Sequence, residues 1–490
     1  MPNRTWPHRS GSAHVRASPP SRAAISVSRI RTMPAASSEG DRATAGRFDG
    51  KCVAIIAVSL ISAGGRGILA GAAAPPVTPE PSNDRPTRRQ TARARELTIH
   101  AAAFAALLWS AVALDLVSPG PLGRFSQFPK GNDFVQFYVA GSLAARGAFA
   151  ALADPGLFAD AQRPMLPDAG LAFPPVYGPQ LALFFAPLSR VPYLWAYALW
   201  AGLTSVLVAW TVVVCRNRAP SLGRWPVATA AIAAAYPPFP YLILVGQISA
   251  VGVASLALGA IALERRSRLG AGAAIGLLGY KASLLVPAVA VCLLGGEPLV
   301  AAIAIATAVA LLVAVVPLAG AASVHAFVVN TLAYARQPDL LAKNRYLMAS
   351  LRTFWEMLLP HHAAIAAYAL SGAAVVGAAA LVWRRTSNPL RRIGVLGLAT
   401  VLAAPHLYFY DLILLVPAFV ASAAILVQAR ALALRWCTYL AFVAPLAAPI
   451  AAYTSVQPVT IVLCAWLAVL ARTVGSGAEP AAPDDPRSAR

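Results

Sequence analysis

Long uncharged apolar runs restrict the possible folds of this chain more than any other feature. The stretch VAAIAIATAVALLVAVVPLAG (300–320) carries no charged side chain, and comparable runs recur along most of the sequence. About 20 apolar residues in a row cross the hydrocarbon core of a bilayer as a helix. Only 12% of the 490 residues are charged, about half the share found in water-soluble globular proteins. The sequence therefore predicts an all-α, polytopic transmembrane protein.

The apolar runs predict about 10–13 spans or half-spans. The first clear span is 97–117, and two long, more polar segments, 118–172 and 320–360, interrupt the series. No internal repeat is visible. Further candidate spans lie at 174–189, 192–214, 225–244, 248–263, 271–294, 299–319, 361–383, 393–404, 406–428, 434–452 and 456–474.

The distribution of Arg and Lys predicts the orientation in the membrane. A net charge of +21 could indicate a nucleic-acid partner, but the basic residues lie in the N-terminal tail and in short loops between spans. Cytoplasmic loops carry such an excess of Lys and Arg. We therefore expect no nucleic-acid partner, cytoplasmic basic loops, and an external location for 118–172 and 320–360. The expected location is a cell membrane, namely the bacterial inner or plasma membrane, with the active site on its external face.

Two segments do not fit this orientation as simple crossings. If Arg216 is cytoplasmic, 174–189 cannot cross fully, and 271–294 must go out and back as two half-helices. Irregular backbone at membrane depth is tolerated only where protein or a water-filled cavity surrounds it. Both segments therefore indicate a cavity.

Composition divides the chain into three parts. Residues 1–95 hold 15 Lys and Arg against five Asp and Glu, with much Ser, Pro and Ala. Such a segment cannot bury a core, so we predict a disordered basic tail. Residues 96–474 form the predicted transmembrane domain, and 475–490 form a second disordered tail. The five cysteines are scattered without the spacing of metal ligands, and no metal site or cofactor is expected.

Polar clusters interrupt the apolar background at a few places. Ionisable groups at membrane depth are costly and usually mark a functional site. The paired prolines of AFPPVYGPQ (172–180) end one segment and begin a helix. The other candidates are Asp133 with Gln136 and Tyr138, Gln247 after Gly246, Lys281 in GLLGYKASLLVP, Ser350, Arg352 and Arg345 in the second long segment, and His406, Tyr408, Tyr410 and Asp411 in APHLYFYDLILLVP.

Each candidate also has a purely structural interpretation. Asp133 is as consistent with a helix N-cap, and Lys281 with a side chain that extends to the interface. Gln247 is typical of an interhelical hydrogen bond. His406 and Asp411 could form a buried structural pair, and Tyr408 and Tyr410 an aromatic belt. The residues alone leave both interpretations open.

The order of these motifs resembles glycosyltransferase family 87. That family has the GT-C fold and includes α-1,2-mannosyltransferases that use a polyprenyl-phosphate-mannose donor. The resemblance covers about 97–470 and consists of short motifs. It implies that Asp133 is the acid of the first loop and acts as general base. It also implies that Phe173 replaces the tyrosine of the family's Tyr-Pro-Pro motif.

The resemblance also extends to the later motifs. Lys281 matches the lysine after a Leu-Leu-x-Tyr element, although Ala282 replaces a common proline. Ser350 and Arg352 match the second-loop Ser-Leu-Arg pattern, with Ala349 where Gln is frequent. His406 and Asp411 match the polar C-terminal span.

The predicted chemistry is sugar transfer from a lipid-linked donor. A carboxylate at the mouth of a span can accept the proton of an attacking hydroxyl. Fixed cations stabilise the departing lipid phosphate, and we assign Lys281, Arg352 and Arg345 to this role. Gln136, Tyr138, Gln247, Ser350, His406, Tyr410 and Asp411 are candidates for the substrate cavity.

One base without a paired nucleophile indicates a single displacement with inversion, and the expected partners are a lipid-linked sugar donor, a glycan or glycolipid acceptor and membrane lipids. The alternatives are a transporter or flippase of a lipid-linked substrate, which would also place ionisable groups at membrane depth, and a structural membrane protein.

Overall fold

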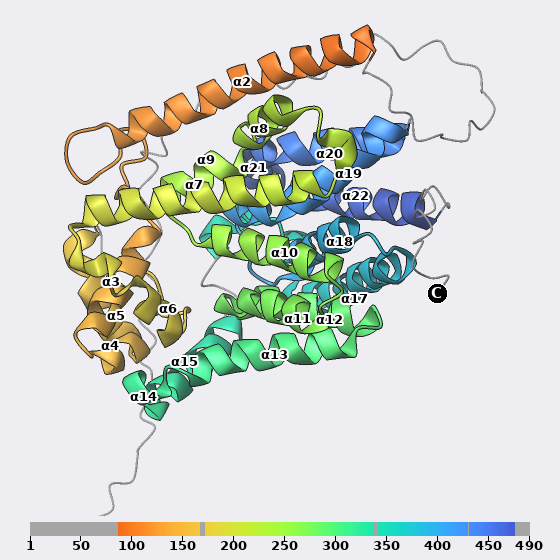
Figure 1. Cartoon of the computed structure of the whole chain (residues 1–490). Coiled ribbons are helices and arrows are strands. Elements are labelled where there is room, and N and C mark those ends of the chain that lie inside the picture. Colours follow the sequence, from red (N-terminus) through yellow and green to blue (C-terminus); the bar gives the residue numbers. More distant parts are fainter. Residues whose placement is uncertain (1–86, 167–171, 337–341, 430, 476–490) are drawn as a thin grey trace, which may run out of the picture. The chain divides into compact units, whose positions relative to one another are not determined.

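The computed structural model describes residues 87–166, 172–336, 342–429 and 431–475. Within these ranges the secondary structure consists of helices, and there is no β-strand beyond two isolated bridges (Figure 1). The two bridges pair Leu122 with Pro129 and Met348 with Tyr408. The predicted all-α architecture is confirmed. Most of the two predicted tails, 1–86 and 476–490, lies outside the described residues.

The helices follow one another along the chain, and most of the connections between them are short. The α-helices are α2 (Arg88–Leu116), α3 (Phe134–Ala145), α4 (Phe149–Ala153), α5 (Pro155–Gln162), α6 (Pro179–Phe185), α7 (Tyr193–Asn217), α8 (Pro226–Ala234), α9 (Pro238–Val245), α10 (Ser249–Glu264), α11 (Arg268–Gly276), α12 (Ala282–Leu294), α13 (Pro298–Val313), α14 (Val316–Ala319), α15 (Ala321–Arg336), α16 (Leu351–Leu358), α17 (His361–Arg385), α18 (Pro389–Ala403), α19 (Val416–Gln428), α20 (Leu432–Val443), α21 (Ala448–Thr454) and α22 (Pro458–Gly475). The 3-10 helices are η1 (Arg163–Met165), η3 (Leu188–Arg190), η4 (Pro220–Leu222), η5 (Leu277–Tyr280), η6 (Ala342–Leu347), η7 (Phe409–Leu415) and η8 (Ala444–Ala447).

Six helices in the described ranges are long and apolar enough to cross a bilayer, which confirms the polytopic class. A bent pair, α8 and α9 with 52° between them, would make a seventh span. Five shorter apolar helices lie among them, including α10, α12 and α22. The six long spans are Gln90–Leu116, Tyr193–Asn217, Pro298–Ala319, His361–Arg385, Phe409–Gln428 and Leu432–Thr454.

Helix α2 begins earlier than predicted. The predicted tail was to end at residue 95, but α2 starts at Arg88, where Thr87 and Gln90 form a capping box. Capping boxes satisfy two backbone N–H groups that a helix start leaves without partners. The segment that follows consists largely of Arg, Ala and Glu, which favour helix. Residues 88–95 therefore belong to the first helix.

The predicted span 225–244 is bent. Pro237, Pro238 and Pro240 fall between and within α8 and α9. Proline removes a backbone donor and clashes with the preceding turn, so the helix breaks at this point. The only α-helix in the segment 174–189 is the seven-residue α6, and η3 begins at Leu188. At about 1.5 Å per residue, α6 is too short to cross a bilayer.

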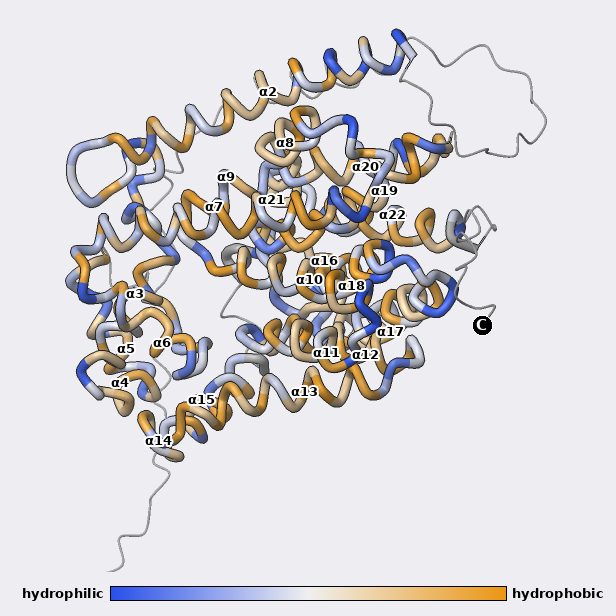
Figure 2. The backbone as a smooth tube through the Cα atoms, viewed as in Figure 1, coloured by the Kyte–Doolittle hydropathy of each residue, from blue (hydrophilic) through white to orange (hydrophobic). Residues whose placement is uncertain are grey.

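The most buried helices lie in the middle of the helical domain and carry polar residues at their ends. The most apolar part of Phe409–Gln428 is 67% buried, against 17% for Gln90–Leu116. Figure 2 shows apolar residues along the outer helices α2, α7 and α13. Exposed side chains such as Leu107, Val206 and Val309 lie there. Such surfaces are suited to lipid, so the inner helices α10, α18 and α19 form the framework around the polar groups.

Close packing of small residues fixes the position of α11 against α13. A Cβ atom on Gly272 would lie 2.6 Å from Ile303 Cβ, and one on Gly276 would lie 2.6 Å from Thr307 Cβ. Glycines four residues apart let two helices approach closely in membrane proteins. This contact holds the turn at η5 and Lys281, between α11 and α12, in place.

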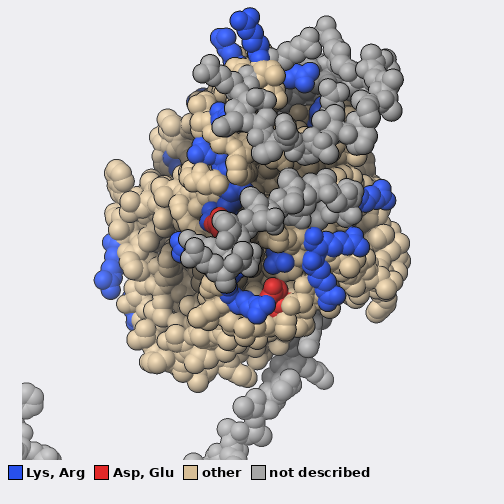
Figure 3. All heavy atoms as spheres, turned by 45° about the vertical axis from the view of Figure 1, so that its right-hand side comes forward, with Lys and Arg blue, Asp and Glu red and all other residues tan. Residues whose placement is uncertain are grey.

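Basic residues and the polar clusters occupy opposite ends of the inner helices. Helix α10 begins beside Gln247 and ends beside Arg265, and α18 begins near Arg391 and ends near His406. Figure 3, turned to bring one end forward, shows Lys and Arg outnumbering Asp and Glu on that side. At the other end α4 and α15 pack together, and Asn330 Nδ2 donates to Ala153 O at 2.7 Å. The two long polar segments therefore contact each other.

Candidate active site

Asp133 sits at the start of α3 but does not cap it. Its carboxylate makes no capping hydrogen bond, so the N-cap interpretation of this residue is wrong. Its backbone N–H instead donates to Val245 O at 2.9 Å. Tyr193 Oη donates to the carbonyl oxygens of Lys130 and Gly131 at 2.7 and 2.9 Å. These contacts fix the backbone that leads into Asp133, and they leave its half-buried side chain to the site.

Gln247 connects Asp133 to the tyrosines. Its Nε2 donates to Asp133 Oδ2 at 2.9 Å and to Tyr410 Oη at 3.2 Å. Its Oε1 accepts from Tyr177 Oη at 3.3 Å and from the Ile248 N–H at 3.0 Å. The amide therefore uses its donors and acceptors in full. Three predicted site residues, Asp133, Gln247 and Tyr410, meet here.

Asp411 forms the second carboxylate of the site. Its Oδ2 accepts from Lys281 Nζ at 2.5 Å, and its Oδ1 accepts from Ser249 Oγ at 2.6 Å. The Tyr408 N–H also reaches Oδ2 at 3.3 Å. Asp411 is 1% exposed and Lys281 15%, so this is a buried ion pair. The Lys281 ammonium also lies 5.8 Å from the centre of the Tyr410 ring, which joins this pair to the Gln247 group.

A second basic group surrounds His406. Arg352 Nε donates to Glu356 Oε1 at 2.8 Å, and Arg345 lies 3.8 Å from the other Glu356 oxygen. Arg352 also contacts His406 Nε2 at 3.3 Å. The structural alternative in which His406 pairs with Asp411 is therefore wrong, because Asp411 binds Lys281 and His406 lies against Arg352.

Two further predicted residues, Tyr138 and Ser350, hydrogen-bond to backbone groups. Tyr138 Oη donates to Val191 O at 2.9 Å, which ties α3 to the turn before α7. Ser350 is the N-cap of α16, where its Oγ accepts from the Thr353 N–H at 3.3 Å. Tyr138 and Ser350 therefore hold the framework, with no bond to Asp133 or Asp411.

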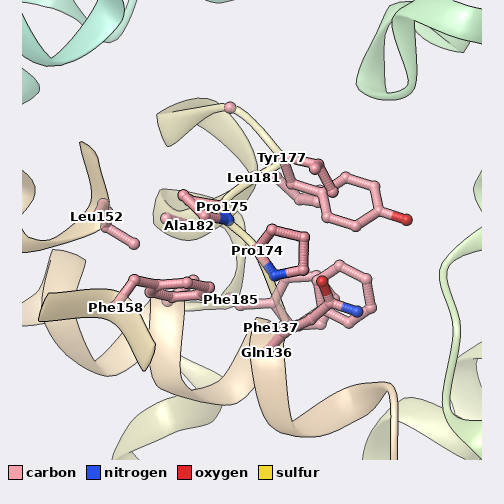
Figure 4. Close-up of a pocket in the computed structure, with 13 residues that line it drawn as sticks. Gln136, Phe137, Leu152, Phe158, Pro174, Pro175, Tyr177, Leu181, Ala182 and Phe185 are labelled. Atoms are coloured by element: carbon pink, nitrogen blue, oxygen red, sulfur yellow. The ribbon is translucent and has the colours of Figure 1, made fainter. Parts of the chain in front are cut away.

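Gln136 lines a small, mostly apolar pocket against the turn at 173–175, here called the FPP turn (Figure 4). Phe137, Pro174 and Pro175 line it as well, and so does Tyr177, whose hydroxyl reaches Gln247. The FPP turn thus brings the Tyr177 hydroxyl to the site. It does more than begin a helix.

Three residues of the site escaped the prediction: Ser249, Glu356 and Tyr177. Glu356 follows Arg352 by four residues in a helix, a spacing that brings opposite charges together and could have indicated it. Ser249 and Tyr177 lie close in sequence to Gln247 and the FPP turn, but no pattern in one sequence assigns their partners.

Asp133 and His406, which lie outside the spanning segments, have shifted pKa values. Burial raises the pKa of Asp133 to about 6, with the charge of Asp411 acting in the same direction. The hydrogen bond from Gln247 and the charge of Lys281 oppose this rise. Burial, followed by the charges of Arg352 and Lys281, lowers the pKa of His406 to about 4. At neutral pH His406 is therefore uncharged, and Asp133 can accept a proton and release it again.

No metal centre is visible in the part of the chain that the structure describes, since no three His, Cys, Asp or Glu side chains come together there. The arrangement offers instead a half-buried carboxylate of raised pKa, cations close to it, and aromatic hydroxyls. Such a set can remove a proton from a hydroxyl and stabilise negative charge on a departing group.

Comparison with known proteins gives one positive result. No curated protein and no solved structure matches the chain. The family match includes Gln247, Lys281, Ser350 and Arg352, whereas Asp133, His406 and Asp411 fall outside it. Residues 176–405 match the model of glycosyltransferase family 87, and this match supports a membrane glycosyltransferase.

Proposed function

We propose that the protein transfers a sugar from a polyprenyl-phosphate donor to an acceptor hydroxyl on the external face of the membrane. The sugar that we propose is mannose. The observation that carries this proposal is the half-buried Asp133 carboxylate beside the Lys281–Asp411 pair, in a chain that matches a glycosyltransferase family. We further propose the GT-C fold for the domain. The expected acceptor is a glycan or glycolipid.

The proposed reaction is a single displacement. The oxygen of the acceptor hydroxyl attacks the anomeric carbon, and a new C–O bond forms. The proton of that hydroxyl passes to the Asp133 carboxylate. The bond between the anomeric carbon and the phosphate oxygen breaks, and its electron pair leaves with the lipid phosphate. With one base and no covalent intermediate, the configuration at the anomeric carbon inverts.

Asp133 can serve an acceptor through its second oxygen. Oδ2 is bound by Gln247, while the amide of Asn132 reaches Oδ1 only at 3.5 Å. A base must lie within hydrogen-bond reach of the proton that it removes, and we assign this contact to Oδ1, the oxygen that Gln247 does not bind. Lys281, whose charge acts on Asp133, is the first proposed phosphate ligand, and Arg352 and Arg345 are further candidates.

Transport of a lipid-linked substrate remains the competing proposal, and one assay separates the two. Purified protein in detergent should transfer radiolabel from polyprenyl-phosphate-mannose to an acceptor glycan. Transport needs a membrane between two compartments, and detergent solution has none. Because ionised Asp133 is the active form, kcat/KM should rise with pH and level off above about pH 6, the pKa of Asp133. Absence of transfer from every polyprenyl-phosphate sugar, together with movement of the lipid across vesicles, would favour the flippase.

Cysteine labelling tests the proposed orientation. In a chain whose native cysteines are changed to alanine, Leu157→Cys reports on α5 and Ser387→Cys on the turn between α17 and α18; both positions are exposed. The basic residues around Ser387 predict a cytoplasmic location. An impermeant maleimide should label Leu157→Cys in intact cells and Ser387→Cys only after permeabilisation. The reverse pattern would place the active site on the cytoplasmic side.

A further inference from the structure

We propose that Gln247 is a positioning residue that holds the Asp133 carboxylate ionised and turns its Oδ1 towards the acceptor. This inference rests on the proposed function, in which Asp133 is the base. Gln247 itself need not touch the substrate. Its role is carried by the hydrogen bond from Nε2 to Asp133 Oδ2, 2.9 Å long.

The orientation of the Gln247 amide is fixed by its other partners. The Ile248 N–H and the Tyr177 hydroxyl both point at Oε1. A backbone N–H can only donate, so this end of the amide must be the oxygen, and Nε2 must face Asp133. The side chain is 2% exposed, which leaves water little room to replace any of these bonds.

The backbone on either side is equally constrained. Trp200 Nε1 lies within hydrogen-bond distance of the carbonyl oxygens of Gly246 and Gln247, at 3.2 and 3.3 Å. Gly246 has a φ of +71°, and a Cβ there would lie 2.7 Å from Phe134 Cβ. The loop therefore approaches the start of α3 as closely as only glycine allows, and this approach brings Gln247 within reach of Asp133.

A neutral donor is suited to this position. Burial disfavours the charged form of a carboxyl, and a hydrogen bond to that form restores part of the loss. A lysine bound directly to Asp133 would depress its pKa and make it a weaker base, and in this site the lysine is directed to Asp411 instead. Gln247 thus keeps Asp133 ionised near neutral pH while leaving it able to accept a proton.

The test is the pH profile of Gln247→Met, which keeps the side-chain length and removes the amide. Loss of a hydrogen bond to a charged group should move the midpoint of the acid limb of kcat/KM upward by about one to two pH units. Activity should recover towards the wild-type level at high pH, where Asp133 is ionised in both proteins. A residue that only supports the fold would lower activity at every pH without moving the midpoint.

Two controls separate positioning from loss of a buried amide. Tyr177→Phe removes one partner of Oε1 but leaves the bond to Asp133, so its midpoint should stay close to that of the wild type. Gln162 is fully buried and bonds to Phe158 and Phe173. Gln162→Met should therefore leave the midpoint unchanged, whatever it does to the level of activity.

A second variant and a second readout cover the other outcomes. If Gln247→Met does not fold, Gln247→Glu keeps the shape of the side chain and places another carboxyl beside Asp133. Two such groups cannot both ionise easily, so the midpoint should move further upward.

Infrared titration gives the pKa of Asp133 without an activity assay. The signal to follow is the carboxyl band that Asp133→Asn removes. A wild-type midpoint in the Gln247 variants overturns this inference alone, whereas an active Asp133→Asn overturns the proposed function.

Discussion

Asp133→Asn should lower the turnover of sugar transfer by about 10²–10⁴-fold, the usual contribution of a positioned base. The asparagine keeps the size of the side chain, and its oxygen can still accept from Gln247 Nε2 as Asp133 Oδ2 does. Donor binding should survive, because the base contacts the acceptor hydroxyl. The measurement is kcat with saturating radiolabelled donor, together with the KM for that donor.

Stability should not fall in the same variant. The pKa of Asp133 is raised from 3.8 to about 6 in the folded protein, so folding favours the protonated form, and the ionised form costs stability above that pH. Asparagine is neutral and removes this cost. The melting temperature at pH 7 to 8 should therefore equal or exceed that of the wild type, which separates lost chemistry from lost folding.

Asp154→Asn is the matched control. Asp154 lies in the same long segment and does cap a helix, accepting from the N–H groups of Gly156 and Leu157 at 2.8 and 2.9 Å. Asparagine is an equally good N-cap, so this variant should transfer sugar at the wild-type rate. If Asp133→Asn behaves like Asp154→Asn, Asp133 is not the base.

Hydrophobicity predicted the class of the fold and several helix limits well. The predicted spans 248–263 and 456–474 differ from α10 (Ser249–Glu264) and α22 (Pro458–Gly475) by at most two residues. A continuous apolar run determines these limits directly. The break between α8 and α9 was missed because the segment is apolar on both sides of its prolines, and a window average does not record the bend.

The sequence also predicted which polar residues lie together better than how they pair. Asp133, Gln247, Lys281, Tyr410 and Asp411 were all candidates and form one connected group. The open alternative paired Asp411 with His406, its near neighbour in sequence. Its actual partner, Lys281, comes from the turn between α11 and α12. Such contacts depend on packing, including the Gly272 and Gly276 approach to α13, and no local pattern specifies them.

The Lys281–Asp411 pair should dominate the stability of the site. Lys281→Met leaves the Asp411 carboxylate buried at 1% exposure with Ser249 as its remaining side-chain donor. Removing one partner of a buried ion pair costs about 3–5 kcal/mol, because the other charge stays without compensation. We expect a loss of this size in the free energy of unfolding, measured by denaturant titration in detergent.

The double variant Lys281→Met/Asp411→Leu should recover most of that loss, because it removes both charges together. The control is the pair Arg163–Asp160, whose side chains are 65% and 58% exposed. Exposed pairs contribute about 0–1 kcal/mol, so Arg163→Met should have little effect. A control loss as large as that of Lys281→Met would mean that the assay does not separate buried from exposed pairs.

Donor affinity distinguishes a structural lysine from a phosphate ligand. If the Lys281 ammonium contacts the lipid phosphate, the double variant should fold stably but bind the donor more weakly than the wild type. KM should rise and kcat should fall together, because the cation stabilises the departing charge as well as the bound one. Asp411→Asn should not raise KM or lower kcat in this way, because it frees Lys281 from its partner and leaves the cation in place. A double variant with wild-type KM and kcat would make Lys281 structural, and the phosphate contact would then fall to Arg352 and Arg345.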